Sequence, residues 1–348
     1  MASLVCAAIL FQFCSKNDTI SSTAASANTT AADAVSVLQL PATPFNYSNI
    51  SFPAYIAAAL TVADNTPLNN PISNDGATLG RVLFYDKSLS KNNTVSCGSC
   101  HRPDLSFSDS AVKSKGFLGG LTARHSMRLL NVRFYKSGKM FWDERAATLE
   151  DQVLQPVQNT TEMGLTLDEL VTKVSAQTYY PSLFQKAFGN TVVSSDKISK
   201  ALAQFVRSIV TFQSKYDKVK QGLAGFTVDE SDGETLFLTK GNVTCAGCHA
   251  PPMFLTSDPA RPFALADATD RGINNQDRFK AGSLRNIAAA GPYFHNGSVA
   301  ALTDMLGGNI PAHSVAPQDR QKLLAFLQTL TDLTTVNDVR YSNPFIKQ

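Results

Sequence analysis

Apolar residues recur at helical spacing in two well-separated parts of the chain. One stripe consists of Ile198, Leu202, Phe205, Ile209 and Phe212, and the other of Leu323, Phe326, Leu327 and Leu330. Spacings of three and four residues place each set on one face of an α-helix. Alternation typical of strands is sparse, and glycine and proline interrupt the long intervals, as in residues 113–120 and 257–263. The pattern predicts a mainly α-helical protein with long loops.

The two stripes belong to a duplicated unit. GRVLFYDK at 80–87 matches GETLFLTK at 233–240 as G-x-x-L-F-x-x-K, and FVRSI at 205–209 matches FLQTL at 326–330. Each unit is predicted to consist of a helix, a central motif and a second helix. A glycine on the first helix allows the second helix to approach closely, and the phenylalanine rings can cover a group held between the helices.

An apolar run at the N-terminus has the length of an export signal rather than that of a membrane span. Residues 3–13 are largely apolar and lead into Cys14, which polar residues follow. We interpret residues 1–14 as a signal peptide of lipoprotein type, with a lipid on Cys14; a plain secretory signal cleaved further along is the alternative. Residues 15–49, rich in Ser, Thr, Ala and Asn, are expected to form a flexible tether. This predicts a periplasmic or cell-envelope protein that contacts the membrane only through the lipid.

The length and composition of the chain exclude few classes of protein. A length of 348 residues favours two domains, and a formal net charge of +3 gives no indication of nucleic-acid binding. Beyond the signal the chain has four cysteines. Exported proteins usually place cysteines in disulfides, so these four are expected to have another task.

All four cysteines lie in two C-x-x-C-H motifs. These are Cys97, Cys100 and His101, and Cys245, Cys248 and His249. Two thiols one helical turn apart can add to the vinyl groups of a haem, and the adjoining histidine can bind its iron. A zinc ion or a thioredoxin-like redox pair also uses C-x-x-C, but the pairs lie too far apart for a zinc ribbon, and neither follows a strand-then-helix pattern. The sequence predicts two c-type haems, each wrapped by a cytochrome c-like domain, at 50–222 and 223–348.

Further segments resemble the bacterial di-haem cytochrome c peroxidase family, which includes the enzyme that matures methylamine dehydrogenase. The matching segments are LGRVLFYDKSLS, SCGSCH, RHSMRLLNVRFY, FWDERAATLEDQ, PVQN, EMG, CAGCH, RFKAGSLRNI and GPYFHNGSV. They follow the family's order over roughly residues 75–335. The resemblance implies an enzyme that reduces hydrogen peroxide to water, with electrons from a small cytochrome c or a cupredoxin.

The resemblance also implies a role for each matching residue. His101 becomes the iron ligand of the haem that meets peroxide, and His249 that of the haem where electrons enter. Glu162 matches the family's distal acid–base glutamate, and Gln152 its neighbouring glutamine. A carboxylate there can move a proton between the two oxygens of peroxide. Trp142, the only tryptophan, matches the residue between the two haems.

Both expected sixth-ligand positions depart from the family pattern. Phe117 stands where many relatives have a loop histidine that binds the resting first iron, which predicts an open iron unless His125 reaches in. At the second haem the family's methionine or tyrosine position counts to Asn309. Met305 and His313 remain as candidates, and we favour Met305. Because axial ligands set the reduction potential of a haem, this choice bears on function.

The family's calcium site is altered as well. His125 replaces its asparagine, and its carbonyl positions fall at Ala290 and Pro292. Imidazole is a poor ligand for a hard cation, so a calcium ion would depend on backbone carbonyls and water. His295 is expected to hydrogen-bond a haem propionate. The resemblance also allows a homodimer.

Two other functions stay open. A protein-modifying oxidase would draw electrons from a partner's side chains through Trp142 and the second haem, and a tyrosine sixth ligand would favour it. A non-catalytic electron-transfer cytochrome would need two saturated irons. Glu162 and Gln152 beside an open iron argue against that second alternative.

Overall fold

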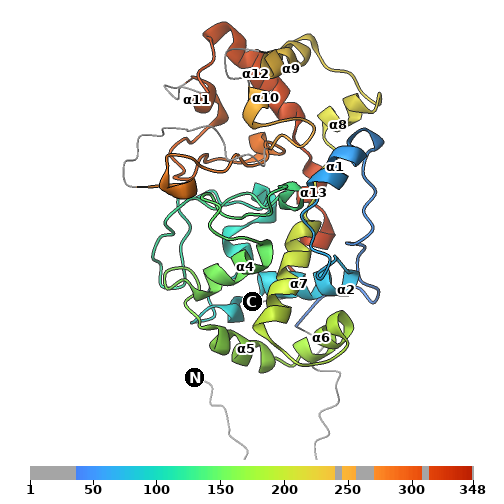
Figure 1. The fold of residues 1–348 in the computed structure, drawn as a ribbon, viewed down its shortest axis with the longest axis vertical. Coiled ribbons are helices and arrows are strands. Elements are labelled where there is room, and N and C mark those ends of the chain that lie inside the picture. Colours follow the sequence, from blue (N-terminus) through green and yellow to red (C-terminus); the bar gives the residue numbers. More distant parts are fainter. Residues whose placement is uncertain (1–36, 240–244, 256–269, 308–312, 347–348) are drawn as a thin grey trace, which may run out of the picture.

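The computed structural model describes residues 37–239, 245–255, 270–307 and 313–346. In these ranges the protein is helical, as predicted, and extended pairing is limited to isolated bridges. The α-helices are α1 (Ala57–Ala63), α2 (Asn74–Tyr85), α3 (Cys97–Cys100), α4 (Leu149–Gln158), α5 (Leu167–Ser175), α6 (Tyr180–Phe188), α7 (Ser195–Ser208), α8 (Lys215–Lys220), α9 (Val228–Thr239), α10 (Cys245–Cys248), α11 (Leu302–Gly307), α12 (Pro317–Thr329) and α13 (Leu333–Val336). Figure 1 shows two groups along the long axis, with α9 to α12 at one end and α2 and α4 to α7 at the other.

The first group is built on the pair α2 and α7. Ser73 caps α2 by accepting a hydrogen bond from the backbone of Gly76, and Ser194 caps α7 in the same way. Gly80 lies against α7 so closely that a Cβ there would be 2.0 Å from the carbonyl oxygen of Ala201. Any larger residue at position 80 would therefore push the two helices apart.

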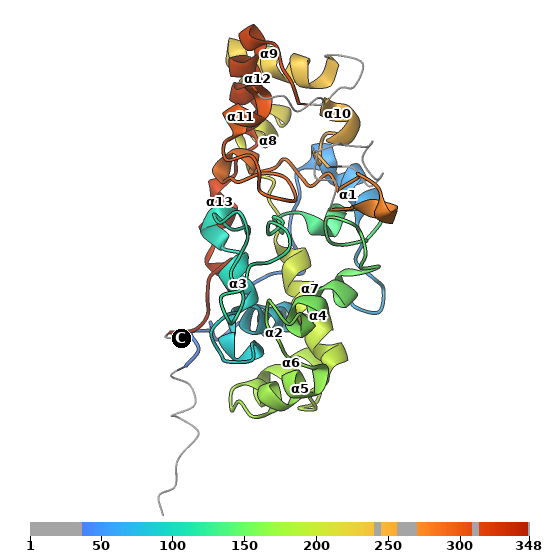
Figure 2. The same ribbon diagram turned by 90° about the vertical axis from the view of Figure 1, so that its left-hand side faces the viewer.

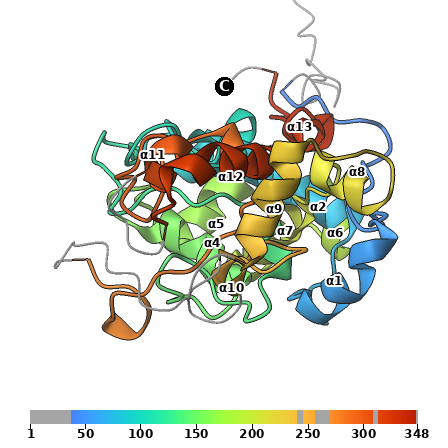
Figure 3. The same ribbon diagram turned by 90° about the horizontal axis from the view of Figure 1, so that it is seen from above.

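The second group repeats this arrangement with α9 and α12, which lie side by side in Figures 1 and 3. A Cβ on Gly233 would be 2.1 Å from the carbonyl oxygen of Lys322. The aromatic contacts correspond too, because the rings of Phe84 and Phe205 lie 5.2 Å apart and those of Phe237 and Phe326 lie 5.3 Å apart. The predicted duplication, with a glycine at each helix crossing, is confirmed.

The ordered body begins before the expected end of the tether. Tyr47 is fully buried, and its hydroxyl donates to the carbonyl oxygen of Arg340 at 2.7 Å. Leu38 pairs with Phe345 in an isolated bridge, so residues 37–49 pack against the folded chain instead of forming a free tether. The reason is that a tyrosine and several apolar side chains in this stretch pack against the C-terminal segment. Figure 2 shows the C-terminal segment running back to the level of α2.

The expected signal peptide lies outside the described residues, as do Cys14 and the first part of the expected tether. In the part of the chain that is described, no helix has both the length and the apolar character needed to span a membrane.

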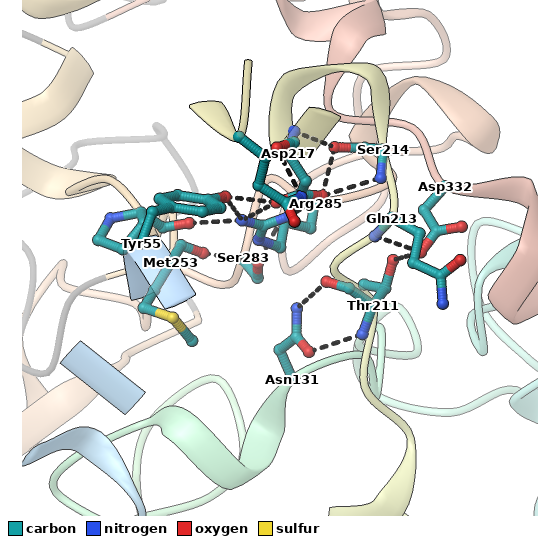
Figure 4. A network of polar contacts seen from close by, with 12 residues as sticks. Tyr55, Asn131, Thr211, Gln213, Ser214, Asp217, Met253, Ser283, Arg285 and Asp332 are labelled. Carbon is teal, nitrogen blue, oxygen red and sulfur yellow. Dashed lines mark hydrogen bonds and ion pairs between the residues drawn. The ribbon is translucent and has the colours of Figure 1, made fainter. Parts of the chain in front are cut away.

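A buried polar network joins the two groups at the connection between α7 and α8 (Figure 4). Asn131 exchanges hydrogen bonds with the backbone of Thr211, whose hydroxyl donates to Asp332 at 2.8 Å. Next to it, the guanidinium of Arg285 and the carboxylate of Asp217 form an ion pair at 2.9 Å with both side chains fully buried. Charged groups this deep are stable only when they are paired, so the network fixes the connection in one arrangement.

Candidate functional site

The first C-x-x-C-H motif forms one helical turn followed by its histidine. Cys97 and Cys100 begin and end α3, and the backbone N–H of His101 donates to the carbonyl oxygen of Cys97 at 2.9 Å. Nδ1 of His101 lies 3.0 Å from the carbonyl oxygen of Phe107. Because that carbonyl accepts the Nδ1 proton, Nε2 keeps its lone pair for a metal. Burial lowers the pKa of His101, which favours the neutral, metal-binding form.

The second motif forms the same helical turn followed by its histidine. Cys245 and Cys248 bound α10, and the backbone N–H of His249 donates to the carbonyl oxygen of Cys245 at 2.8 Å. Burial lowers the pKa of His249 to about 4, so this imidazole is also neutral at ordinary pH. The four thiols form no disulfide, and the described residues hold no cluster of three or more His, Cys, Asp or Glu side chains suited to a metal ion.

Two adjoining cavities open beside the first motif. Their volumes are about 660 and 90 Å³, and His101, Gln152 and Glu162 line both of them. Cys97 and Cys100 line the smaller cavity, and Trp142 lines the larger one. The structure therefore brings the predicted residues of the first site into one space.

Glu162 reaches this space from the turn that follows α4. Its backbone N–H donates to the side-chain oxygen of Asn159, which ends that helix. Burial raises the pKa of the Glu162 carboxyl, and the guanidinium of Arg145 offsets part of the rise. Gln152 lies on α4, and Pro156, one turn later, lines the same cavities. A carboxyl with a raised pKa beside an amide can exchange protons with a small polar substrate.

Phe117 and His125, the two residues considered for the sixth position of the first iron, are both engaged elsewhere. The backbone N–H of Phe117 donates to the carbonyl oxygen of Glu162 at 3.0 Å, and its ring lies against Gly164. His125 is buried, with Nδ1 3.1 Å from the carbonyl oxygen of Ala111 and Nε2 3.2 Å from the hydroxyl of Ser108. These contacts hold the His125 ring within the protein and support an open first site.

Trp142 lies where the first site meets the second. It lines the 660 Å³ cavity and also a cavity of about 180 Å³ that contains His249. Its indole N–H donates to the carbonyl oxygen of His125 at 2.8 Å, and the next link, from the N–H of His125 to the carbonyl oxygen of His295, measures 2.7 Å. The His295 ring stacks on Phe279 with centroids 3.6 Å apart. An aromatic and hydrogen-bonded path thus leads from one cavity to the other.

The 180 Å³ cavity contains both candidates for the second sixth ligand. Met305 on α11 and His313 line it together with His249, Cys245 and Cys248. Burial and the neighbouring His249 lower the pKa of His313 to about 4. Asn309, the position counted from the family pattern, lies outside the described residues.

Two cations at the boundary of these cavities, one buried and one half-buried, were not predicted from the sequence. Arg128 and Lys280 line both the 660 Å³ and the 180 Å³ cavity. The guanidinium of Arg128 donates to the carbonyl oxygen of Ala290, one of the two carbonyls considered for calcium. The sequence does show an arginine within the mainly apolar stretch MRLLNV. A single arginine there is equally typical of an exposed side chain on the protein surface, so the sequence alone did not indicate a site.

The residues at both sites fit a covalently attached haem. Each has two free thiols one turn apart, a half-buried neutral histidine after them and an adjoining cavity. The two cations between the cavities also suit a group that carries carboxylates. When bound, a haem supplies redox-active iron at each histidine.

Comparison with known proteins points in the same direction. A model of the di-haem cytochrome c peroxidase family matches residues 74–224. The cytochrome c551 peroxidase of Nitrosomonas europaea is 33% identical over 81% of this chain and 89% of its own length. The methylamine utilization protein MauG of Methylophilus methylotrophus is 29% identical over 76% of this chain and 84% of its own.

The fold comparison agrees with the sequence comparison. The crystal structure of a MauG-like protein associated with microbial copper homeostasis superposes with a TM-score of 0.74 at 30% identity. The match covers 85% of this chain and 99% of that one.

Proposed function

Because the chain belongs to the di-haem cytochrome c peroxidase family, we propose that its site around His101 reduces hydrogen peroxide and its site around His249 delivers the electrons. The enzyme is an oxidoreductase with two c-type haems, and its reaction converts peroxide, two electrons and two protons into two waters. A redox protein donates the electrons; a small cytochrome c or a cupredoxin is our proposal for it.

A difference between the two cavities carries this assignment of tasks. Glu162 lines the cavities at His101, whereas the wall of the 180 Å³ cavity at His249 contains no carboxylate among the described residues. Peroxide cleavage requires a proton to leave one oxygen and reach the other, so a proton-exchanging group is needed where peroxide binds. Electron transfer at the other haem does not require one.

Each side chain of the first site has a defined task. The Glu162 carboxylate accepts a proton from the oxygen of peroxide nearest the haem and returns it to the far oxygen, which leaves as water. The Gln152 amide orients peroxide by hydrogen bonding. Trp142 lines both cavities and offers its ring as a stepping point for electrons.

The ferric protein as isolated tests the open first site. Since Phe117 cannot bind iron and His125 is engaged with Ser108 and Ala111, we expect electron paramagnetic resonance to show one high-spin and one low-spin haem. Peroxide turnover should begin without an activation lag. The Phe117→His variant, which introduces the missing histidine, should become low-spin at both haems. Low-spin signals from both haems of the wild type would refute the open site.

The same spectrum identifies the sixth ligand of the second haem, for which we propose Met305. The Met305→Leu variant should lose the wild-type low-spin signal, and His313→Leu should keep it. The opposite result would assign the ligand to His313, which lines the same cavity.

We also propose export to the periplasm or cell envelope, with residues 1–14 as signal and a lipid on Cys14. The support is the apolar run that ends at Cys14. Mass spectrometry of the mature protein should find an acylated N-terminal Cys14, and Cys14→Ser should release the protein from the membrane fraction. Cys6→Ser is the matched control. A mature N-terminus beyond residue 14 would indicate a plain secretory signal instead.

Three further expectations stay proposals. We propose the two haem domains at 50–222 and 223–348 from the sequence, with residues 37–49 and the segment around Tyr341 packing on the first of them. For calcium we propose that no ion is needed, because the guanidinium of Arg128 already contacts the carbonyl of Ala290; metal analysis of the purified protein would reveal bound calcium. A homodimer would appear as twice the chain mass in solution.

The protein-modifying oxidase remains the second candidate function, because relatives named MauG match over three quarters of this chain. Trp142 at the boundary of the two cavities would serve that reaction as well. Rapid turnover of peroxide with a reduced small cytochrome c would favour the peroxidase over the oxidase.

A further inference from the structure

Two cations, a buried lysine and a half-buried arginine, lie at the boundary of the 660 Å³ and 180 Å³ cavities. Lys280 has only 7% of its surface exposed. Its Nζ donates to the carbonyl oxygen of Lys139 at 2.7 Å and lies 3.4 Å from the centre of the Tyr135 ring. Its backbone N–H donates to the carbonyl oxygen of Trp142, which ties it to the residue between the sites.

Arg128 is the second of these cations and comes from the other half of the chain. One Nη atom donates to the carbonyl oxygen of Ala290, and the guanidinium lies 5.4 Å from the centre of the Tyr293 ring. Its Nε is buried and has no hydrogen-bond partner among the residues that the structure describes. A guanidinium has five N–H donors in a planar fork, so Arg128 retains donors for a further acceptor.

Neither cation has a carboxylate within ion-pair distance in the described part of the chain, although Glu144, which accepts a hydrogen bond from Tyr135, attracts Lys280 at longer range. The ion pairs found there include other buried or half-buried arginines, such as Arg207 with Glu150 and Arg285 with Asp217, but not Arg128 or Lys280. Burial lowers the pKa of Lys280 to about 7 and that of Arg128 to about 10. A buried charge without an ion-pair partner costs roughly several kcal/mol, and this applies most directly to Lys280. Both positions are therefore suited to an anion that enters from the cavities.

The anion must bind where the two cavities meet. A haem carries two propionate carboxylates on one edge of its ring, and the two haem motifs open into these two cavities. Carboxylates paired with a guanidinium or an ammonium form short, charge-assisted hydrogen bonds. We propose that Arg128 and Lys280 bind haem propionates at the boundary of the two cavities and thereby hold the facing edges of the haems in place.

A consequence for redox chemistry follows from the charges. A ferric haem carries one more positive charge than a ferrous haem, so nearby cations disfavour the ferric state. Arg128 and Lys280 therefore raise the reduction potential of the haem whose propionates they bind. The inference rests on the presence of two haems and is independent of which haem reduces peroxide.

Spectroelectrochemical titration of both haems in the holoprotein, without peroxide, tests this inference. Arg128→Met and Lys280→Met should each lower the potential of at least one haem, whereas the charge-keeping Arg128→Lys and Lys280→Arg should restore most of it. Lys186→Met, which removes an exposed lysine on α6, is the control and should change neither potential. Unchanged potentials in both methionine variants would overturn the proposal.

Resonance Raman spectroscopy gives a second test that does not require the methionine variants to fold. The propionate bending vibration reports hydrogen bonding to the carboxylate, so it should shift in Arg128→Lys or Lys280→Arg, in which the length and geometry of the donor change. A small anion from solution, instead of a propionate, would leave this band unchanged. An unchanged band in both charge-keeping variants therefore also counts against propionate binding.

Discussion

Replacing Glu162 with glutamine lowers kcat/KM for hydrogen peroxide by about 10²- to 10⁴-fold, the usual contribution of a positioned general acid–base. Glutamine keeps the size and hydrogen-bonding capacity of the side chain, but it cannot take up and return a proton. The fold should be unaffected, because the structural contacts of this residue are made by its backbone N–H and carbonyl oxygen, with Asn159 and Phe117.

The assay follows the peroxide-dependent oxidation of a reduced small cytochrome c. Glu234→Gln provides the matched control, since it makes the same substitution on α9, away from the first cavity. Both variants should keep the absorption spectrum of a protein with two haems. If Glu162→Gln turned over at the wild-type rate, Glu162 would not be the proton-transfer group. The difference between the two cavities would then no longer support the assignment of the two sites.

The pH profile adds a second readout of the same residue. Glu162 must be deprotonated to accept a proton from peroxide, and burial raises its pKa above the ordinary value of 4.5. Activity should therefore fall as the pH decreases through a value higher than 4.5, and this acid limb should be absent from the residual activity of Glu162→Gln. An unaltered acid limb in the variant would assign the titration to another group.

Replacing Arg285 with methionine destabilises the protein by about 3–5 kcal/mol, the range for breaking a buried ion pair from one side. The substitution leaves the Asp217 carboxylate buried without its cation, at the connection that joins the two halves (Figure 4). Tyr55 and Ser214 donate to the same carboxylate, but neutral hydroxyl groups do not neutralise its charge. Denaturant unfolding, followed through the haem absorption, measures the loss.

Two further variants serve as comparisons for this result. The double variant Asp217→Asn with Arg285→Met removes both charges and should recover a large part of the stability, because the cost arises mainly from the charge left alone. Lys200→Met breaks an exposed ion pair with Asp196 within α7 and should cost less than about 1 kcal/mol. A small loss in Arg285→Met would mean that water reaches Asp217.

The sequence was most informative where a local pattern determines geometry. Gly80 and Gly233 stand at equal positions of the repeat, and both proved to lie at helix crossings where no Cβ fits. The two C-x-x-C-H motifs each formed one helical turn. These features depend on residues that are close in sequence, or on a repeat in which the same residue pattern occurs twice.

Features that depend on residues far apart in the sequence were harder to predict from local patterns. Ile198 to Phe212 suggested one helical stripe, yet α7 ends at Ser208, and Phe212 packs with Phe52 and Phe134 in a separate cluster. The burial of Lys280 depends on segments about 140 residues away along the chain, including Lys139. Similarly, Tyr47 is buried because the C-terminal segment covers it.

The return of the C-terminal segment has a consequence for the order in which the molecule is assembled. Tyr341 belongs to the apolar core of the first half and donates to the carbonyl oxygen of Ser208 at 2.6 Å. The first half therefore cannot complete its core until the segment that contains Tyr341 has been synthesised. By then all four cysteines of the haem motifs have emerged, so an enzyme that attaches haem can act on a loose chain at both motifs before the body closes over them.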